Sequence, residues 1–121
     1  MTLTDCFARF GVTVSNSRNA PWSGQAQDGT VVVTLWSDQF LDTERNLYST
    51  GPHKPNTITN WKNKLRTEHL QHARNKNAGI FQSIVVTHIT PENNKFELGA
   101  RMKLTHLDES KGEFRAERAA G

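Results

Sequence analysis

The hydrophobic pattern begins with a helical stretch and then changes to an extended one. Apolar residues recur at helical spacing over residues 3–10, ahead of Gly11, which predicts a short amphipathic helix. Over residues 21–36, Trp22, Gly24 and Ala26 alternate with polar residues, and a run rich in valine, residues 30–36, follows Asp28-Gly29. Asp-Gly between two extended runs indicates a hairpin, because both central residues of a type I′ turn need positive φ. We therefore predict a helix followed by a β-hairpin.

Residues 37–56 have no sustained hydrophobic period, and Gly51, Pro52 and Pro55 punctuate their end. A connection of about 20 residues is long for a compact domain, and such loops are usually functional, disordered or misread. We predict a long loop. The alternative is a short helical turn held against the body by its apolar residues, which are Phe40, Leu41, Leu47 and Tyr48.

Residues 57–76 carry the clearest helical pattern in the chain. One arc at about 100° per residue holds five bulky side chains, namely Ile58, Trp61, Leu65, His69 and His72. Asn56 or Thr57 can cap the first turn, and Asn77-Ala78-Gly79 ends the pattern. We predict one main helix that packs on a sheet through this arc.

Three further strands follow the main helix. Residues 80–89 are rich in β-branched residues on both faces, which predicts a central strand covered on both sides. Residues 96–105 alternate and so have one buried and one exposed face, and residues 113–118 form a charged edge strand after a turn at 108–112. The predicted class is α+β, with a bent antiparallel or mixed sheet of about five strands, one main helix packed on it and a short N-terminal helix.

Length and composition restrict the class of protein further. A chain of 121 residues with 35% hydrophobic residues has room for one domain, over residues 1–121. No run approaches the roughly 20 apolar residues that cross a bilayer, and the start lacks the order of a signal peptide. Cys6 is the only cysteine, and a lone thiol fits a reducing compartment and a small buried side chain. We expect a cytoplasmic protein, monomeric or homo-oligomeric, with no membrane partner.

Charge is distributed unevenly along the chain. The net charge is +3, yet residues 53–76 hold six Lys or Arg residues and one Glu. A basic segment on a slightly acidic body is typical of proteins that bind phosphates or carboxylates, although a solvated helix face gives the same count. DNA or RNA is therefore a candidate partner.

Aromatic and basic residues occur together in this region. Trp36 closes a predicted strand, Tyr48 lies in the predicted loop, and Lys62 and Arg66 lie one turn apart on one helix flank, where they can reach a common anion. A flat aromatic ring can stack on a base while cations hold the backbone phosphates. The predicted binding residues are Trp36, Tyr48, Lys54, Lys62 and Arg66. The alternative is that Trp36 belongs to the core and that the cations are only solvated.

Enzymatic chemistry has weaker support in the sequence. His69-x-x-His72 places two imidazoles on one helical face, and His53, His88 or His106 could add a third metal ligand. We expect these histidines to be structural and expect no metal or cofactor, since histidines on an apolar arc are usually hydrogen-bonded core residues. Glycine-rich phosphate loops and a nucleophile elbow are absent from the sequence. Paired carboxylates for a hydrolase would come from Asp38, Asp42, Glu44 and the C-terminal acidic residues.

Three hypotheses follow from these patterns. The first is a non-enzymatic module that binds nucleic acid or another polyanion through the basic helix and the adjacent loop. The second is an accessory domain that binds a small ligand or a protein through an apolar pocket near Trp36. The third is a metal-dependent or hydrolytic enzyme that uses His69 and His72.

A resemblance covers about the middle half of the chain. The segments Val31-Val-Val-Thr-Leu-Trp-Ser-Asp-Gln-Phe40, Trp61-Lys-x-Lys-Leu65 and Ser83-Ile-Val-Val86 resemble a pattern in small uncharacterised bacterial proteins of mobile DNA, such as integron gene cassettes. The resemblance implies a bacterial, cytoplasmic protein and carries over no catalytic residue. The order of elements is also compatible with PUA-like barrels that read modified bases, an analogy of architecture alone.

Overall fold

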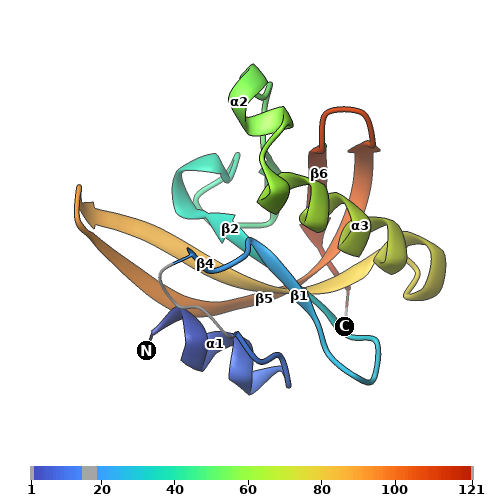
Figure 1. The fold of residues 1–121 in the computed structure, drawn as a ribbon, viewed down its shortest axis with the longest axis horizontal. Helices are drawn as coiled ribbons and strands as arrows, with labels where there is room; N and C mark the ends of the chain where they lie inside the picture. The colour runs from blue at the N-terminus through green and yellow to red at the C-terminus, as the bar shows by residue number, and fades with distance from the viewer. Residues whose placement is uncertain (1, 15–18, 121) are drawn as a thin grey trace.

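The computed structural model describes residues 2–14 and 19–120 as an α+β fold (Figure 1). In chain order its elements are α1 (Leu3–Arg9), β1 (Ser23–Gln25), β2 (Val31–Trp36), the 3-10 turn η2 (Ser37–Gln39), β3 (Leu47–Ser49), α2 (Pro55–Ile58), α3 (Trp61–Lys76), β4 (Ile80–Thr90), β5 (Asn93–Asp108) and β6 (Glu113–Arg118). The predicted class, with one main helix and a short N-terminal helix, is confirmed. The sheet is mixed and has six strands where the sequence predicts about five.

The strand order across the sheet is β1-β2-β4-β5-β6-β3. β2 pairs parallel with β4, and every other neighbouring pair is antiparallel. The predicted central strand is confirmed, because β4 lies inside the sheet between β2 and β5. The prediction that residues 113–118 form an edge is wrong, since β3 pairs with β6 and becomes the edge strand itself.

Two helices cover opposite faces of the sheet (Figure 1). The core beneath α3 joins buried residues of the helix and five strands, including Val33, Leu35, Leu70, Phe81, Met102 and Phe114. The core beneath α1 is smaller and includes Cys6, Phe7, Val12, Val32 and Ile84. Cys6 is fully buried, as the sequence predicts. No helix in the described part of the chain has both the length and the apolar character to span a bilayer.

The first hairpin forms, but with a different turn from the predicted one. Gly29 has φ +92° and donates its N–H to the carbonyl of Ala26, while Asp28 does not adopt a positive φ. The N–H of Ala26 bonds to the carbonyl of Thr30, so the loop has three residues. A three-residue loop combines a type I turn with one left-handed residue, so only the glycine needs a positive φ.

The predicted helix over residues 57–76 is divided in two. α2 ends at Ile58, and the Asn60 side chain accepts a hydrogen bond from the Lys62 N–H at 2.9 Å, which caps α3. The predicted packing arc is wrong, because the buried side of α3 consists of Asn63, Arg66, Thr67, Leu70 and Ala73. Trp61, a member of the predicted arc, is 48% exposed.

The strand predicted to have one buried face changes faces in its middle. The pairing with β4 shifts register opposite Ser83, where β5 has one more residue than β4. As a result Phe96 packs against the core beneath α1, whereas Met102 belongs to the core beneath α3. A β-bulge inserts one extra residue and so reverses the sides on which later residues point.

The predicted loop over residues 37–56 holds ordered structure. It contains η2 and β3, and an isolated antiparallel bridge pairs Phe40 with Tyr48. Of its four apolar residues, Tyr48 is 1% exposed whereas Leu41 is 64% exposed. Tyr48 therefore anchors the segment to the core, as part of a strand and not of a helical turn.

Candidate functional site

Two tryptophans and a lysine line one hollow beside the C-terminal half of β2. We call it the tryptophan hollow; its volume is about 240 Å³, and its walls include Trp22, Trp36, Lys62, Val86, Asn94 and Phe96. Two of the five predicted binding residues, Trp36 and Lys62, thus lie in the same hollow. Each is partly buried, so each keeps accessible surface.

The sheet register sets the position of Trp36. Trp36 pairs with Val86 across the parallel strands, and Val86 pairs with Phe96, so the three side chains share one face. The Trp36 ring stacks on His88, with centroids 5.3 Å apart and planes 9° apart. His88 Nδ1 lies 2.6 Å from Asn94 Oδ1, which fixes the imidazole and, through it, the indole.

Lys62 supplies the charge of the tryptophan hollow. It is the second residue of α3, where the Asn60 cap fixes the start of the helix. Among the described residues that line the hollow, Lys62 is the only charged one. The hollow therefore combines flat apolar walls with a single positive charge, which suits a planar ring that carries an anionic group.

Arg66 does not share this site, and the prediction that it meets an anion beside Lys62 is wrong. Its side chain is 2% exposed, and its guanidinium lies 5.1 Å from the ring centroids of both Trp22 and Phe114. One guanidinium nitrogen donates to Asn63 Oδ1 at 2.9 Å. The charge is stabilised inside the fold by two aromatic faces and is not presented to a ligand.

The surroundings of Arg66 favour the neutral form of His53. Arg66 Nη2 lies 3.2 Å from His53 Nε2, and the Gly112 carbonyl lies 3.4 Å from the same nitrogen. Because a guanidinium only donates, the contact with Arg66 needs a neutral imidazole with Nε2 as the acceptor. Burial lowers the pKa of Arg66 to about 10, which leaves it charged at neutral pH. Burial, and then the Arg66 charge, lower the pKa of His53 below its ordinary value.

Tyr48 is also a core residue, so the prediction that it stacks on a base is wrong. Its hydroxyl donates to Gln39 Oε1 and accepts from the Trp36 N–H at 3.3 Å. Burial raises the pKa of Tyr48 to about 12. The side chain thus supports the strand end that carries Trp36.

Lys54, the fifth predicted binding residue, is exposed at the residue that precedes α2. It does not line the tryptophan hollow. The Lys54 side chain is accessible to a polyanion, but it does not share a pocket with Lys62.

The paired histidines of α3 contact β1. His69 Nδ1 lies 2.7 Å from Ser23 Oγ, and His72 Nε2 lies 3.4 Å from Gln25 Nε2. Burial lowers the pKa of His69. In the described ranges, 2–14 and 19–120, no three His, Cys, Asp or Glu residues group as metal ligands would.

Two of the candidate carboxylates, Asp42 and Glu44, hold the loop in place. Asp42 accepts hydrogen bonds from the N–H groups of Asn46 and Leu47, and Glu44 accepts from the Asn46 amide. These contacts hold the turn that leads into β3. Asp42 and Glu44 therefore have a structural role in this segment.

Several residues of the tryptophan hollow have no signal in the sequence. Trp22, Asn94 and Phe96 join Trp36 only through the strand register and the segment that precedes β1. No local spacing relates them, since the parallel pairing of β2 with β4 spans more than 40 residues of sequence.

No family model, curated protein or solved structure matches the chain. The resemblance to proteins of mobile DNA therefore stays a prediction.

Proposed function

We propose that this protein binds single-stranded nucleic acid, with one base in the tryptophan hollow and a neighbouring phosphate at Lys62. The observation that supports the proposal is the presence of Trp36 and Lys62 in one hollow. Base stacking on an aromatic ring and phosphate contact by a cation together hold single strands without a catalytic group.

The size of the hollow favours a strand over a free small ligand. Pockets that bury a small-molecule ligand usually measure about 300–1,000 Å³. The tryptophan hollow, at about 240 Å³, suits one ring. The remainder of a strand would lie on the surface, where Lys54 is exposed and the net charge of +3 attracts phosphates.

Fluorescence anisotropy with a labelled single-stranded oligonucleotide at about 50 mM salt tests the proposal, because phosphate contacts are least screened at low salt. Trp36→Ala should weaken binding at least about fivefold, from roughly 1 kcal/mol or more per stacked base. Lys62→Glu should weaken it about tenfold and lower the slope of log K against log salt by about one.

A matched control separates the site from general effects of charge. Lys64→Glu makes the same charge change as Lys62→Glu, on the exposed surface of α3 outside the hollow. This variant should bind nearly as the wild type does. Absent binding, or equal losses in Lys62→Glu and Lys64→Glu, would contradict the proposal.

A mononucleotide arm tests the small-ligand hypothesis with the same variants. A strand site should bind the oligonucleotide far more tightly than the mononucleotide, because only the strand offers further phosphates. Equal affinities, both lost in Trp36→Ala, would assign the hollow to a small ligand and overturn the nucleic-acid proposal.

A further inference from the structure

A second hollow lies between β3, β5 and β6, and shares no residue with the tryptophan hollow. Its volume is about 610 Å³, within the usual range for small-molecule sites. Along β6, Phe114 and Ala116 pack into the core beneath α3, so the residue between them, Arg115, points to the opposite face. We call this hollow the strand hollow, after the three strands that form it.

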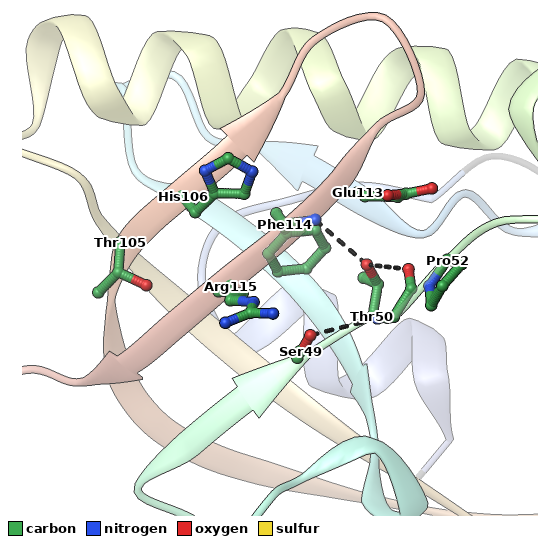
Figure 2. Close-up of a pocket in the computed structure, with 9 residues that line it drawn as sticks. Ser49, Thr50, Pro52, Thr105, His106, Glu113, Phe114 and Arg115 are labelled. Atoms are coloured by element: carbon green, nitrogen blue, oxygen red, sulfur yellow. Dashed lines mark hydrogen bonds between the residues drawn. The ribbon is translucent and has the colours of Figure 1, made fainter.

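One row of side chains crosses the three strands at the strand hollow. Ser49 of β3 pairs with Arg115 of β6, and Arg115 pairs with His106 of β5. Neighbouring strands lie about 4.8 Å apart, so these side chains stand side by side. Figure 2 shows these side chains in the hollow, with Thr50 and Pro52 at the right, beyond Ser49.

A β-bulge adds His106 to this row. The pairing of β5 with β6 shifts between Leu104 and His106, and both Thr105 and His106 line the hollow as a result. In a regular strand, consecutive side chains point to opposite faces. Bulges frequently occur beside functional sites because they re-aim side chains in this way.

The side chains of the row keep hydrogen-bond donors available. In the described part of the chain Arg115 makes no ion pair, and the charged pairs join Arg45 to Glu97 and Arg74 to Glu109. Ser49 Oγ accepts from the Gly51 N–H at 3.2 Å, which leaves the hydroxyl proton to donate. A guanidinium, an imidazole and a hydroxyl in one row form a set of donors that fits an anion.

Glu113 is the opposing charge in the strand hollow. One of its carboxylate oxygens accepts from the His53 N–H at 2.9 Å, so the side chain is tied to the segment before α2. It stands two residues from Arg115 on β6, about 7 Å along the strand. The carboxylate therefore limits where an anion binds and places it toward Arg115 and His106.

We propose that the strand hollow binds a small organic anion, with a carboxylate or phosphate group held by Arg115, His106 and Ser49. Arg115 offers the planar fork that matches either group. Pro52 is exposed on the wall of the hollow and offers an apolar surface for the rest of the ligand. The proposal is independent of nucleic-acid binding, since the two hollows have different residues.

Backbone amide NMR, with inorganic phosphate and succinate as separate probes to about 10 mM, tests this proposal. One or both should cause saturable shifts at residues 49–51, 105–106 and 113–115, and the stronger probe identifies the anionic group. Arg115→Gln should weaken that binding about tenfold. Glu113→Gln should strengthen it, because the variant keeps an acceptor for the His53 N–H and removes a like charge.

The opposite signs of the two variants distinguish anion recognition from loss of structure, which would weaken binding in both. Arg101→Gln is the matched control, since Arg101 is an exposed arginine of β5 outside the strand hollow. Its affinity should equal that of the wild type. The absence of saturable shifts, or equal losses in Arg115→Gln and Arg101→Gln, would overturn the proposal.

Discussion

Arg66 connects three parts of the fold through one side chain. Its guanidinium contacts Trp22, which precedes β1, and Phe114 of β6, and it bonds to Asn63 of its own helix. Its Nε has no partner among the described residues. A buried cation without a carboxylate is costly unless acceptors and aromatic faces surround it. A second positive charge on His53 would add to this cost, so the neutral imidazole is favoured beside Arg66.

The pH dependence of stability should reveal this pair. The unfolded chain protonates His53 near its ordinary pKa of about 6.5, whereas burial and the Arg66 charge lower the pKa in the folded state. The folded state then binds fewer protons in this window, so stability is lost as pH falls from about 6.5 toward the folded pKa. The Gly112 carbonyl, 3.4 Å from His53 Nε2, and then the Glu113 charge partly offset the effect.

Urea denaturation at about pH 7.5 and about pH 5 measures that loss. His53→Gln keeps an acceptor for Arg66 and cannot protonate, so it should lose less free energy of unfolding than the wild type over this interval. His69 and the carboxylates titrate in both proteins and cancel in the difference. An identical loss in both proteins would refute the link between His53 and Arg66.

Two predicted binding residues, Arg66 and Tyr48, lie in the core although the sequence favours an exposed position for both. Arg66 is charged, and Tyr48 follows a stretch without a hydrophobic period. Tyr48 is buried because β3 pairs with β6, nearly 70 residues later. Trp36 and Lys62 could be chosen as candidate binding residues from their side-chain chemistry alone. The hollow that they share could not be predicted, because it depends on the fold.

At the scale of elements, α3 shows where periodicity misleads. Its buried side includes Asn63, Arg66 and Thr67, which no hydrophobic count assigns to a core. His69, from the predicted arc, contacts β1 through Ser23, so this flank of the helix is also partly covered. The existence and the C-terminal end of α3 were predictable, and its orientation was not.

The strands were more predictable than the helix, except at their irregularities. β6 has the predicted bounds, residues 113–118, and β4 extends one residue beyond the predicted 80–89. β5 extends three residues beyond both ends of the predicted 96–105, and β3 lies where a loop was predicted. The bulge opposite Ser83 has only an indirect signal, Gly99, where a Cβ would overlap the Ser83 side chain. A glycine inside a strand pattern is the usual mark of a bulge or a close approach.

The turn between β5 and β6 is held to α3 by Asn63, which yields a prediction. Asn63 Nδ2 donates to the Lys111 carbonyl at 2.8 Å, and a Cβ at Gly112 would overlap the Asn63 amide. Gly112→Ala should therefore lower the free energy of unfolding at least about 1 kcal/mol more than Gly51→Ala. Gly51 is the matched control, because its φ is +68° against +76° and a Cβ there meets nothing within 4 Å.

Both substitutions cost roughly 1–2 kcal/mol in left-handed strain, so the difference isolates the contact with Asn63. Urea denaturation of the two variants measures it. Equal losses would mean that the turn moves away from α3 without cost.

At the scale of the whole molecule, the strand order creates both hollows. The parallel pairing of β2 with β4 puts Trp36 beside Val86, and the late pairing of β3 with β6 puts Ser49 beside Arg115. The α+β class follows from local patterns, because the long strands and the main helix each carry a recognisable hydrophobic pattern. The order of the strands in the sheet does not follow from local patterns, since it depends on the packing of distant segments.

The most direct measurement of the central claim is amide and indole NMR of the wild-type protein with an unlabelled single-stranded oligonucleotide. Binding in the tryptophan hollow predicts the largest shifts at the Trp22 and Trp36 indoles and at the amides of Lys62 and Asn94. The strand hollow, including Arg115, should shift little. Largest shifts at the strand hollow, or no shifts at about 50 mM salt, would contradict the account.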